Sequence, residues 1–131
     1  MITEDYCSFE ISKLLKEKGF DGWCDYFYDD PRRQELRTKD GEDKYWNGHL
    51  WDDEYAAPTH QMAMKWLREE KGIYVYVEPY LLGGTYIDEL EVHYCGRILD
   101  SNRRRLHSIG NRTSYTEAIE ERIKYALKSL I

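Results

Sequence analysis

The chain has 131 residues, of which 41% are hydrophobic and 34% charged, and its formal net charge is −6. This length and apolar content predict a single domain, residues 1–131, whose core needs neither disulfides nor a structural metal. Overall acidity argues against duplex nucleic acid as a partner, because duplex binding requires many phosphates to be neutralised. No apolar run is long enough to cross a bilayer, and the N-terminus lacks the basic and apolar regions of a signal peptide. We therefore expect a cytoplasmic protein that does not bind membranes.

Residues 8–18 are predicted to form the first helix. Ile11, Leu14 and Leu15 fall on one helical face, and Gly19 is suited to end the helix. Residues 23–28 have the aromatic content of a strand. A turn at Asp29-Asp30-Pro31 follows, and residues 35–38 are predicted as a short second strand that pairs back on the first.

Residues 39–57 are predicted to form a long acidic loop rich in large aromatic side chains. The loop contains four of them: Tyr45, Trp46, Trp51 and Tyr55. Loops of this length in small domains are often functional. Solvating two indole rings is unfavourable, so we expect Trp46 and Trp51 to pack on the body or on a partner. The wider segment 21–58 has eleven acidic and five basic residues, so it carries a net charge of −6.

The second helix is predicted to open at Pro58-Thr59, with Thr59 as N-cap, and to end at Gly72. Residues 73–80 alternate as a strand, which places Tyr74, Tyr76 and Tyr80 on one face.

Gly83-Gly84 is predicted to make a turn into a partner strand over residues 86–95. Gly96 is expected to mark a bulge, or a turn into a short extension over residues 97–99.

Ser114 and Glu117 have the spacing of a capping box, which predicts a last helix that continues to Leu130. The element order is therefore α-β-β-α-β-β-α. It predicts an α+β fold with a single antiparallel sheet of three to five strands and helices packed on one face.

The three cysteines, Cys7, Cys24 and Cys95, form no C-x-x-C pair, so we expect buried free thiols. The four histidines lack metal-ligand spacing, and His49 beside Asp52–Glu54 is the nearest to a metal site. Glu42-Asp43-Lys44 has the form of a nuclease triplet but lies in the predicted loop. We find no nucleophile motif. These observations favour a binding protein over an enzyme, with no catalytic residues, metal or cofactor.

Residues 96–112 carry five arginines against one acidic residue. Guanidinium groups match phosphate oxygens in pairs, and aromatic rings stack on nucleotide bases. The predicted ligand site therefore combines phosphate contacts with stacking walls, and its residues are Arg103, Arg104, Arg105, Tyr74, Tyr76 and Trp51. The alternatives are a solvated basic loop that pairs with the acidic segment, and tyrosines that cover the sheet under the long loop.

Two segments carry a resemblance to a known family. They are residues 8–20, SFEISKLLKEKGF, and residues 57–69, which begin Ala57-Pro58-Thr59. Together with Ser114-Tyr115 and Glu117-Ala118, they resemble a family of small uncharacterised proteins from phages and mobile elements of gut Bacteroidales. The resemblance implies a host-cell protein of phage or mobile-element origin and implies no catalytic residues. The acidic loop and the arginine cluster depart from the family pattern, so we expect any specialised task there.

Three hypotheses follow. The first is a non-catalytic binding protein, such as a counter-defence protein that sequesters a nucleotide signal or inhibits a host protein. The second is a metal-dependent hydrolase or nuclease that uses residues 42–54. The third is an interaction module whose acidic loop imitates nucleic acid and occupies a basic partner.

Overall fold

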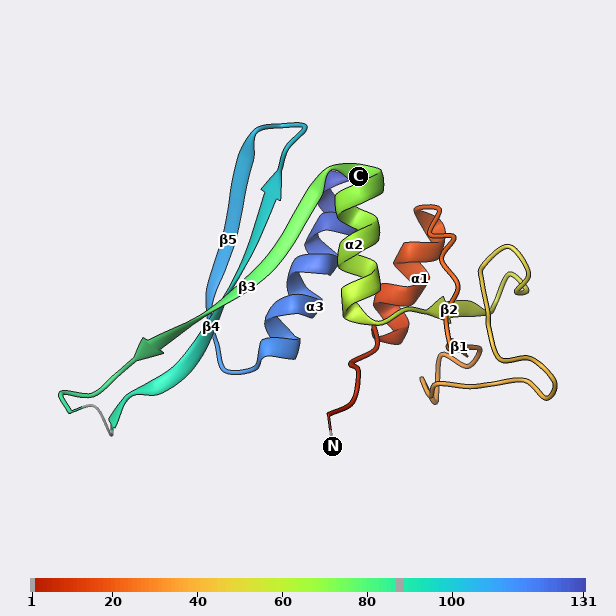
Figure 1. Ribbon diagram of the computed structural model, residues 1–131, viewed down its shortest axis with the longest axis horizontal. Coiled ribbons are helices and arrows are strands. Elements are labelled where there is room, and N and C mark those ends of the chain that lie inside the picture. The colour runs from red at the N-terminus through yellow and green to blue at the C-terminus, as the bar shows by residue number, and fades with distance from the viewer. Residues whose placement is uncertain (1, 87–88) are drawn as a thin grey trace.

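The computed structural model describes residues 2–86 and 89–131. Its helices lie between two separate antiparallel sheets (Figure 1). The elements in chain order are α1 (Phe9–Glu17), β1 (Tyr26–Tyr28), β2 (Tyr55–Ala57), α2 (His60–Lys71), β3 (Ile73–Leu82), β4 (Glu91–Asp100), β5 (Arg105–Arg112), α3 (Tyr115–Tyr125) and the π-helix η2 (Ala126–Leu130).

The predicted α+β class is confirmed, but the predicted single sheet is wrong. β1 pairs with β2, and β3, β4 and β5 form a second sheet in that order. Residues 35–38 form no strand and contribute one isolated bridge, Arg37 with Phe27. The true partner of β1 lies inside the predicted loop, where Ala56-Ala57 offers neither β-branched residues nor alternation to reveal a strand.

The helix starts agree with the sequence signals. Ser8, Thr59 and Ser114 are the three N-caps, and each side chain accepts a hydrogen bond from a backbone N–H three residues on. α2 ends at Gly72, whose φ of 66° favours a residue without a Cβ. Only half of the capping box is present: Glu117 donates its backbone N–H to the Ser114 hydroxyl, and its carboxylate lies 3.8 Å from Nε of Arg112 instead of capping Ser114.

The three-stranded sheet differs from the prediction at its second and third strands. β4 begins at Glu91, and residues 87 and 88 of the predicted strand lie outside the described residues. β5 is unpredicted, since its arginine-rich sequence resembles a loop. The bulge expected at Gly96 is present, as a register shift between Tyr94 and Gly96.

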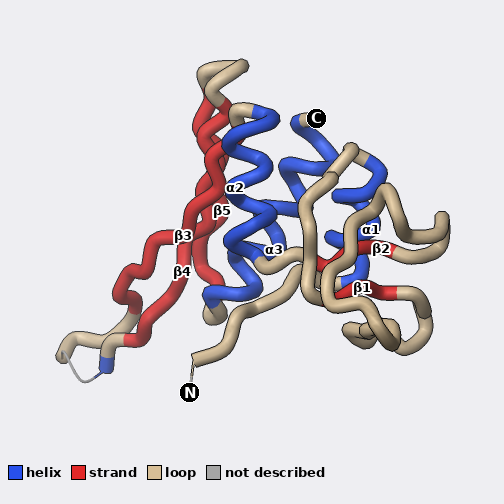
Figure 2. The backbone as a smooth tube through the Cα atoms, turned by 45° about the vertical axis from the view of Figure 1, so that its right-hand side comes forward, coloured by secondary structure: helices blue, strands red, loops and turns tan. Residues whose placement is uncertain are grey.

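The helices cover only one face of this sheet, as Figure 2 shows. Ile73, Val75 and Ile98 are buried on the inner face, where they join the core formed with the helices. On the outer face Tyr74 is 41% exposed, and Leu99, its cross-strand neighbour, is exposed too. No helix of the described residues has the length and apolar content to cross a membrane.

All three cysteines are free. Cys7 and Cys24 are buried as expected, whereas Cys95 is only half-buried. Burial raises the pKa of the Cys7 thiol well above its ordinary value and that of Cys24 to about 12. These two thiols are therefore held in their protonated, unreactive form.

The carboxylate of Glu120 joins all three helices. It accepts hydrogen bonds from the backbone N–H of Ser8 at 3.0 Å and from the Ser8 hydroxyl at 3.1 Å, at the start of α1. It also accepts one from Nε2 of His60 at 2.7 Å, at the start of α2. Since His60 is buried, this carboxylate replaces the water that its ring nitrogen would otherwise bind.

We expect Glu120→Ala to lower the free energy of unfolding by about 3 kcal/mol, because it leaves His60 and Ser8 without their acceptor. Glu120→Gln keeps one acceptor oxygen and should lose less. Urea denaturation measures both, with Glu69→Ala on the exposed face of α2 as the control. Equal effects of Glu120→Ala and Glu69→Ala would show that the helices do not depend on this carboxylate.

Candidate functional site

The aromatic loop, residues 29–54, is held in place by Tyr45. Backbone hydrogen bonds join Tyr45 to Cys24 in both directions, at 2.7 and 2.8 Å. The buried hydroxyl of Tyr45 accepts from the backbone N–H of Lys39 at 2.6 Å and donates to the carbonyl of Glu42 at 2.7 Å. The loop therefore has a defined conformation although it contains almost no regular structure.

A second anchor ties the loop to α1. The ammonium of Lys16 donates to the carbonyl oxygens of Trp51 and Glu54, both at 2.7 Å. The Glu54 carboxylate accepts from the backbone N–H of Trp51 and from the ammonium of Lys39, both at 3.0 Å. Burial opposes the charge of Glu54, but these donors outweigh it and hold the pKa of Glu54 below its ordinary value.

The loop and Trp23, which precedes β1, line an open pocket of about 690 Å³, which we call the aromatic pocket. Three of its rings form a cluster: the centroids of Trp46 and His49 lie 4.9 Å apart, those of Trp23 and Trp46 5.7 Å, and those of Trp23 and His49 6.2 Å. Trp51 also lines the pocket. Trp23 is 54% exposed and Trp51 75%, so both indole rings remain available to a ligand.

Gly48 allows this cluster to form. A Cβ at Gly48 would lie 2.2 Å from the ring of Trp46, a distance that no side chain tolerates. The glycine therefore lets the indole fold across its own loop. Any larger residue at position 48 would push Trp46 away from His49.

The aromatic pocket has unbalanced negative charge. Four charged residues line it, Lys39, Glu42, Asp43 and Lys44. The two lysines pair with acids outside the lining, Lys39 with Glu54 at 3.0 Å and Lys44 with Asp25. Glu42 and Asp43 form no ion pair within residues 2–86 and 89–131, so their charge is available to a cationic ligand.

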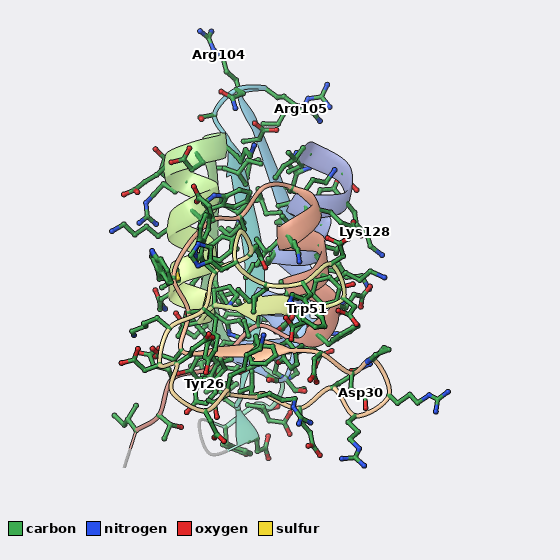
Figure 3. All side chains as sticks on the ribbon, turned by 90° about the vertical axis from the view of Figure 1, so that its right-hand side faces the viewer. Tyr26, Asp30, Trp51, Arg104, Arg105 and Lys128 are labelled. Carbon is green, nitrogen blue, oxygen red and sulfur yellow. The ribbon has the colours of Figure 1, made fainter. Side chains whose placement is uncertain are left out.

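The predicted ligand-site residues do not form one site. Tyr74 and Tyr76 lie on the outer face of the three-stranded sheet, uncovered by the aromatic loop. Arg103 and Arg104 lie in the β4–β5 turn, and Arg105 begins β5. Figure 3 shows Arg104 and Arg105 at one tip of the molecule and Trp51 on the aromatic loop, well away from them.

The structure also bears on the nuclease and metal hypotheses from the sequence. Lys44 of the nuclease-like triplet pairs with Asp25. In the part of the chain that the structure describes, no three His, Cys, Asp or Glu side chains converge as metal ligands would.

Sequence reasoning missed Trp23 and His49 as partners of Trp46. Trp23 falls in the predicted strand over residues 23–28, and the sequence around His49 suggests only a metal ligand. The signal that pointed to the site was the excess of tryptophan and tyrosine in an acidic segment, with Gly48 two residues after Trp46.

Comparison with protein-family models, with curated proteins and with solved structures found no match. The resemblance to small proteins of phages and mobile elements therefore stays a prediction. The function must be argued from the site itself.

We expect Glu54 to make the loop's stability depend on pH. Because the pKa of Glu54 is lower in the folded protein than in the unfolded chain, its stabilisation is complete above the unfolded pKa. It is lost as the pH falls from the unfolded pKa through the lower folded pKa. The difference in unfolding free energy between the protein and its Glu54→Gln variant should therefore be larger at pH 7 than at pH 3. A difference that stays constant over this range would contradict the assignment.

Proposed function

We propose that this is a non-catalytic binding protein whose aromatic pocket takes a cationic side chain from a basic segment of a partner protein. The observation that carries the proposal is the cluster of Trp23, Trp46 and His49 on the wall of a pocket that also presents Glu42 and Asp43. An acidic interaction module that occupies a basic partner, one of the hypotheses from the sequence, is the form of binding that this pocket supports.

The rings favour a cation because the face of an indole carries negative electrostatic potential. The attraction is about 0.5–1 kcal/mol at an exposed site and about 2 kcal/mol when a cation is desolvated. Burial of the exposed faces of Trp23 and Trp51 beneath a partner adds hydrophobic stabilisation. The cation–π attraction and the hydrophobic burial favour the same ligand, a lysine or arginine whose alkyl chain lies along the rings.

A protein partner is favoured over a small cation because the negative charge extends beyond the pocket. Segment 21–58 carries a net charge of −6 in total, and Asp52 and Asp53 are exposed next to Trp51. A basic segment would contact these acids together, whereas a single small cation engages only a few. Exposed aromatic side chains are also enriched where proteins bind one another.

Calorimetric titration with a tetra-arginine peptide tests the proposal. We expect binding at low salt that weakens as salt is raised, because exposed charges are screened. A tetracitrulline peptide, which has nearly the same shape without charge, should bind at least about tenfold more weakly.

Two matched variants locate the site. Trp23→Ala should weaken binding of the tetra-arginine peptide about five- to tenfold, since it removes one wall of the cluster. Tyr74→Ala removes an exposed aromatic ring from the outer face of the sheet and should leave binding unchanged. Equal binding of the two peptides, or equal loss in the two variants, would rule out the aromatic pocket as the cation site.

A further inference from the structure

A second pocket, of about 300 Å³, lies where β5 meets α3 and η2. Its lining includes one aromatic ring, one aliphatic side chain and four cationic side chains, namely Tyr125, Ile109, Arg112, Arg122, Lys124 and Lys128. Glu121 is the one acid among the described residues of the lining, so cationic side chains outnumber acidic ones there. We call this the Arg122 pocket.

Arg122 is the cation in this lining that lacks a partner. Only 8% of its surface is exposed, and its enclosed Nε atom has no hydrogen-bond partner. No carboxylate in residues 2–86 and 89–131 pairs with its guanidinium. Burial lowers the pKa of Arg122 from its ordinary value. An enclosed donor without an acceptor is costly. The two terminal nitrogens of the guanidinium are not enclosed in this way, so they remain open to a ligand in the pocket.

The other cations of the lining are already engaged. Arg112 pairs with Glu121 at 2.7 Å. Lys124 and Lys128 both approach Glu10, at 3.0 and 3.4 Å. Lys128 is exposed and points outward in Figure 3. The pocket therefore offers one guanidinium that no carboxylate of the described residues pairs with. The two lysines near it have rotatable side chains that can turn toward a ligand.

Packing holds the vacant guanidinium in position. A Cβ at Gly96 would lie 2.5 Å from Cγ of Arg122, so the bulged glycine makes room for the arginine stem beneath α3. The guanidinium lies 4.9 Å from the ring centroid of Tyr125, which also lines the pocket. The wide turn of η2 follows at Ala126, and π-helical turns are frequent at functional sites.

We propose that the Arg122 pocket binds the phosphate group of a small organic molecule. The planar guanidinium supplies paired donors that match phosphate oxygens, and the two lysines add charge without fixed geometry. Tyr125 and Ile109 give an apolar wall for the organic part of the ligand. The volume matches the lower end of small-molecule sites. This proposal is independent of the aromatic pocket, which different elements form.

Three probes at constant ionic strength test the proposal by calorimetry: phenyl phosphate, inorganic phosphate and phenol. We expect phenyl phosphate to bind most tightly, inorganic phosphate to bind more weakly, and phenol not to bind. Failure of both phosphates to bind, or binding of phenol as tight as that of phenyl phosphate, would overturn the proposal.

Variants of Arg122 separate a binding role from a packing role. Arg122→Met keeps the length of the stem and removes the unpaired charge, so we expect an unchanged or higher thermal midpoint together with loss of phenyl phosphate binding. Arg122→Lys keeps the charge without the planar donors and should bind at least about tenfold more weakly. The control, Arg104→Met, alters an exposed arginine of the β4–β5 turn and should bind normally. Retained binding in Arg122→Met, or loss in Arg104→Met alone, would overturn the assignment.

Discussion

The carboxylate of Glu120 is the contact on which the arrangement of the other elements depends. By accepting from Ser8 and His60 it brings the first turns of α1 and α2 to the middle of α3. β2 runs through Pro58 directly into α2, so the same contact fixes the end of the aromatic loop. α3 in turn places Arg122 over Gly96 of β4. Both pockets are therefore positioned by one helix layer, which the shared hydrophobic core and the Glu120 carboxylate hold together.

The parts of the fold that local chemistry determines could be predicted from the sequence. Ser8, Thr59, Gly72 and Ser114 carry their capping signals within a few residues, so the three helix starts and the end of α2 are correct. The last helix reaches Leu130 as predicted, but its final turn is the π-helix η2. Strand pairing is not local. Nothing in Ala56-Ala57 indicates that these residues pair with Tyr26 and Phe27 across a loop of nearly thirty residues, and the polar residues of β5 are strand only because β4 lies beside them.

The same difference between local and non-local signals explains which site residues could be predicted from the sequence. The aromatic excess of an acidic segment predicted Trp51 as a site residue, but the ring cluster beside it is set by how Trp46 folds over Gly48 and how Tyr45 anchors the loop. Arg122 lies three residues after Ile119 and four before Ala126, so the sequence places it on the apolar face of the last helix but does not show what it contacts there. Only the structure shows that it is buried on Gly96 without a carboxylate, whereas the conspicuous run of Arg103, Arg104 and Arg105 lies at an exposed turn.

The central claim is that two pockets of opposite charge preference lie on separate elements around one helix layer. Proton–nitrogen correlation spectra, recorded with tetra-arginine peptide and then with phenyl phosphate, test it most directly. We expect the peptide to shift the indole N–H signals of Trp23, Trp46 and Trp51, and phenyl phosphate to shift the Nε–H signal of Arg122 and the amide of Tyr125. The indole of Trp66, buried in the core, should respond to neither. Overlapping shifts for the two ligands, or shifts centred on the β4–β5 turn, would contradict the account.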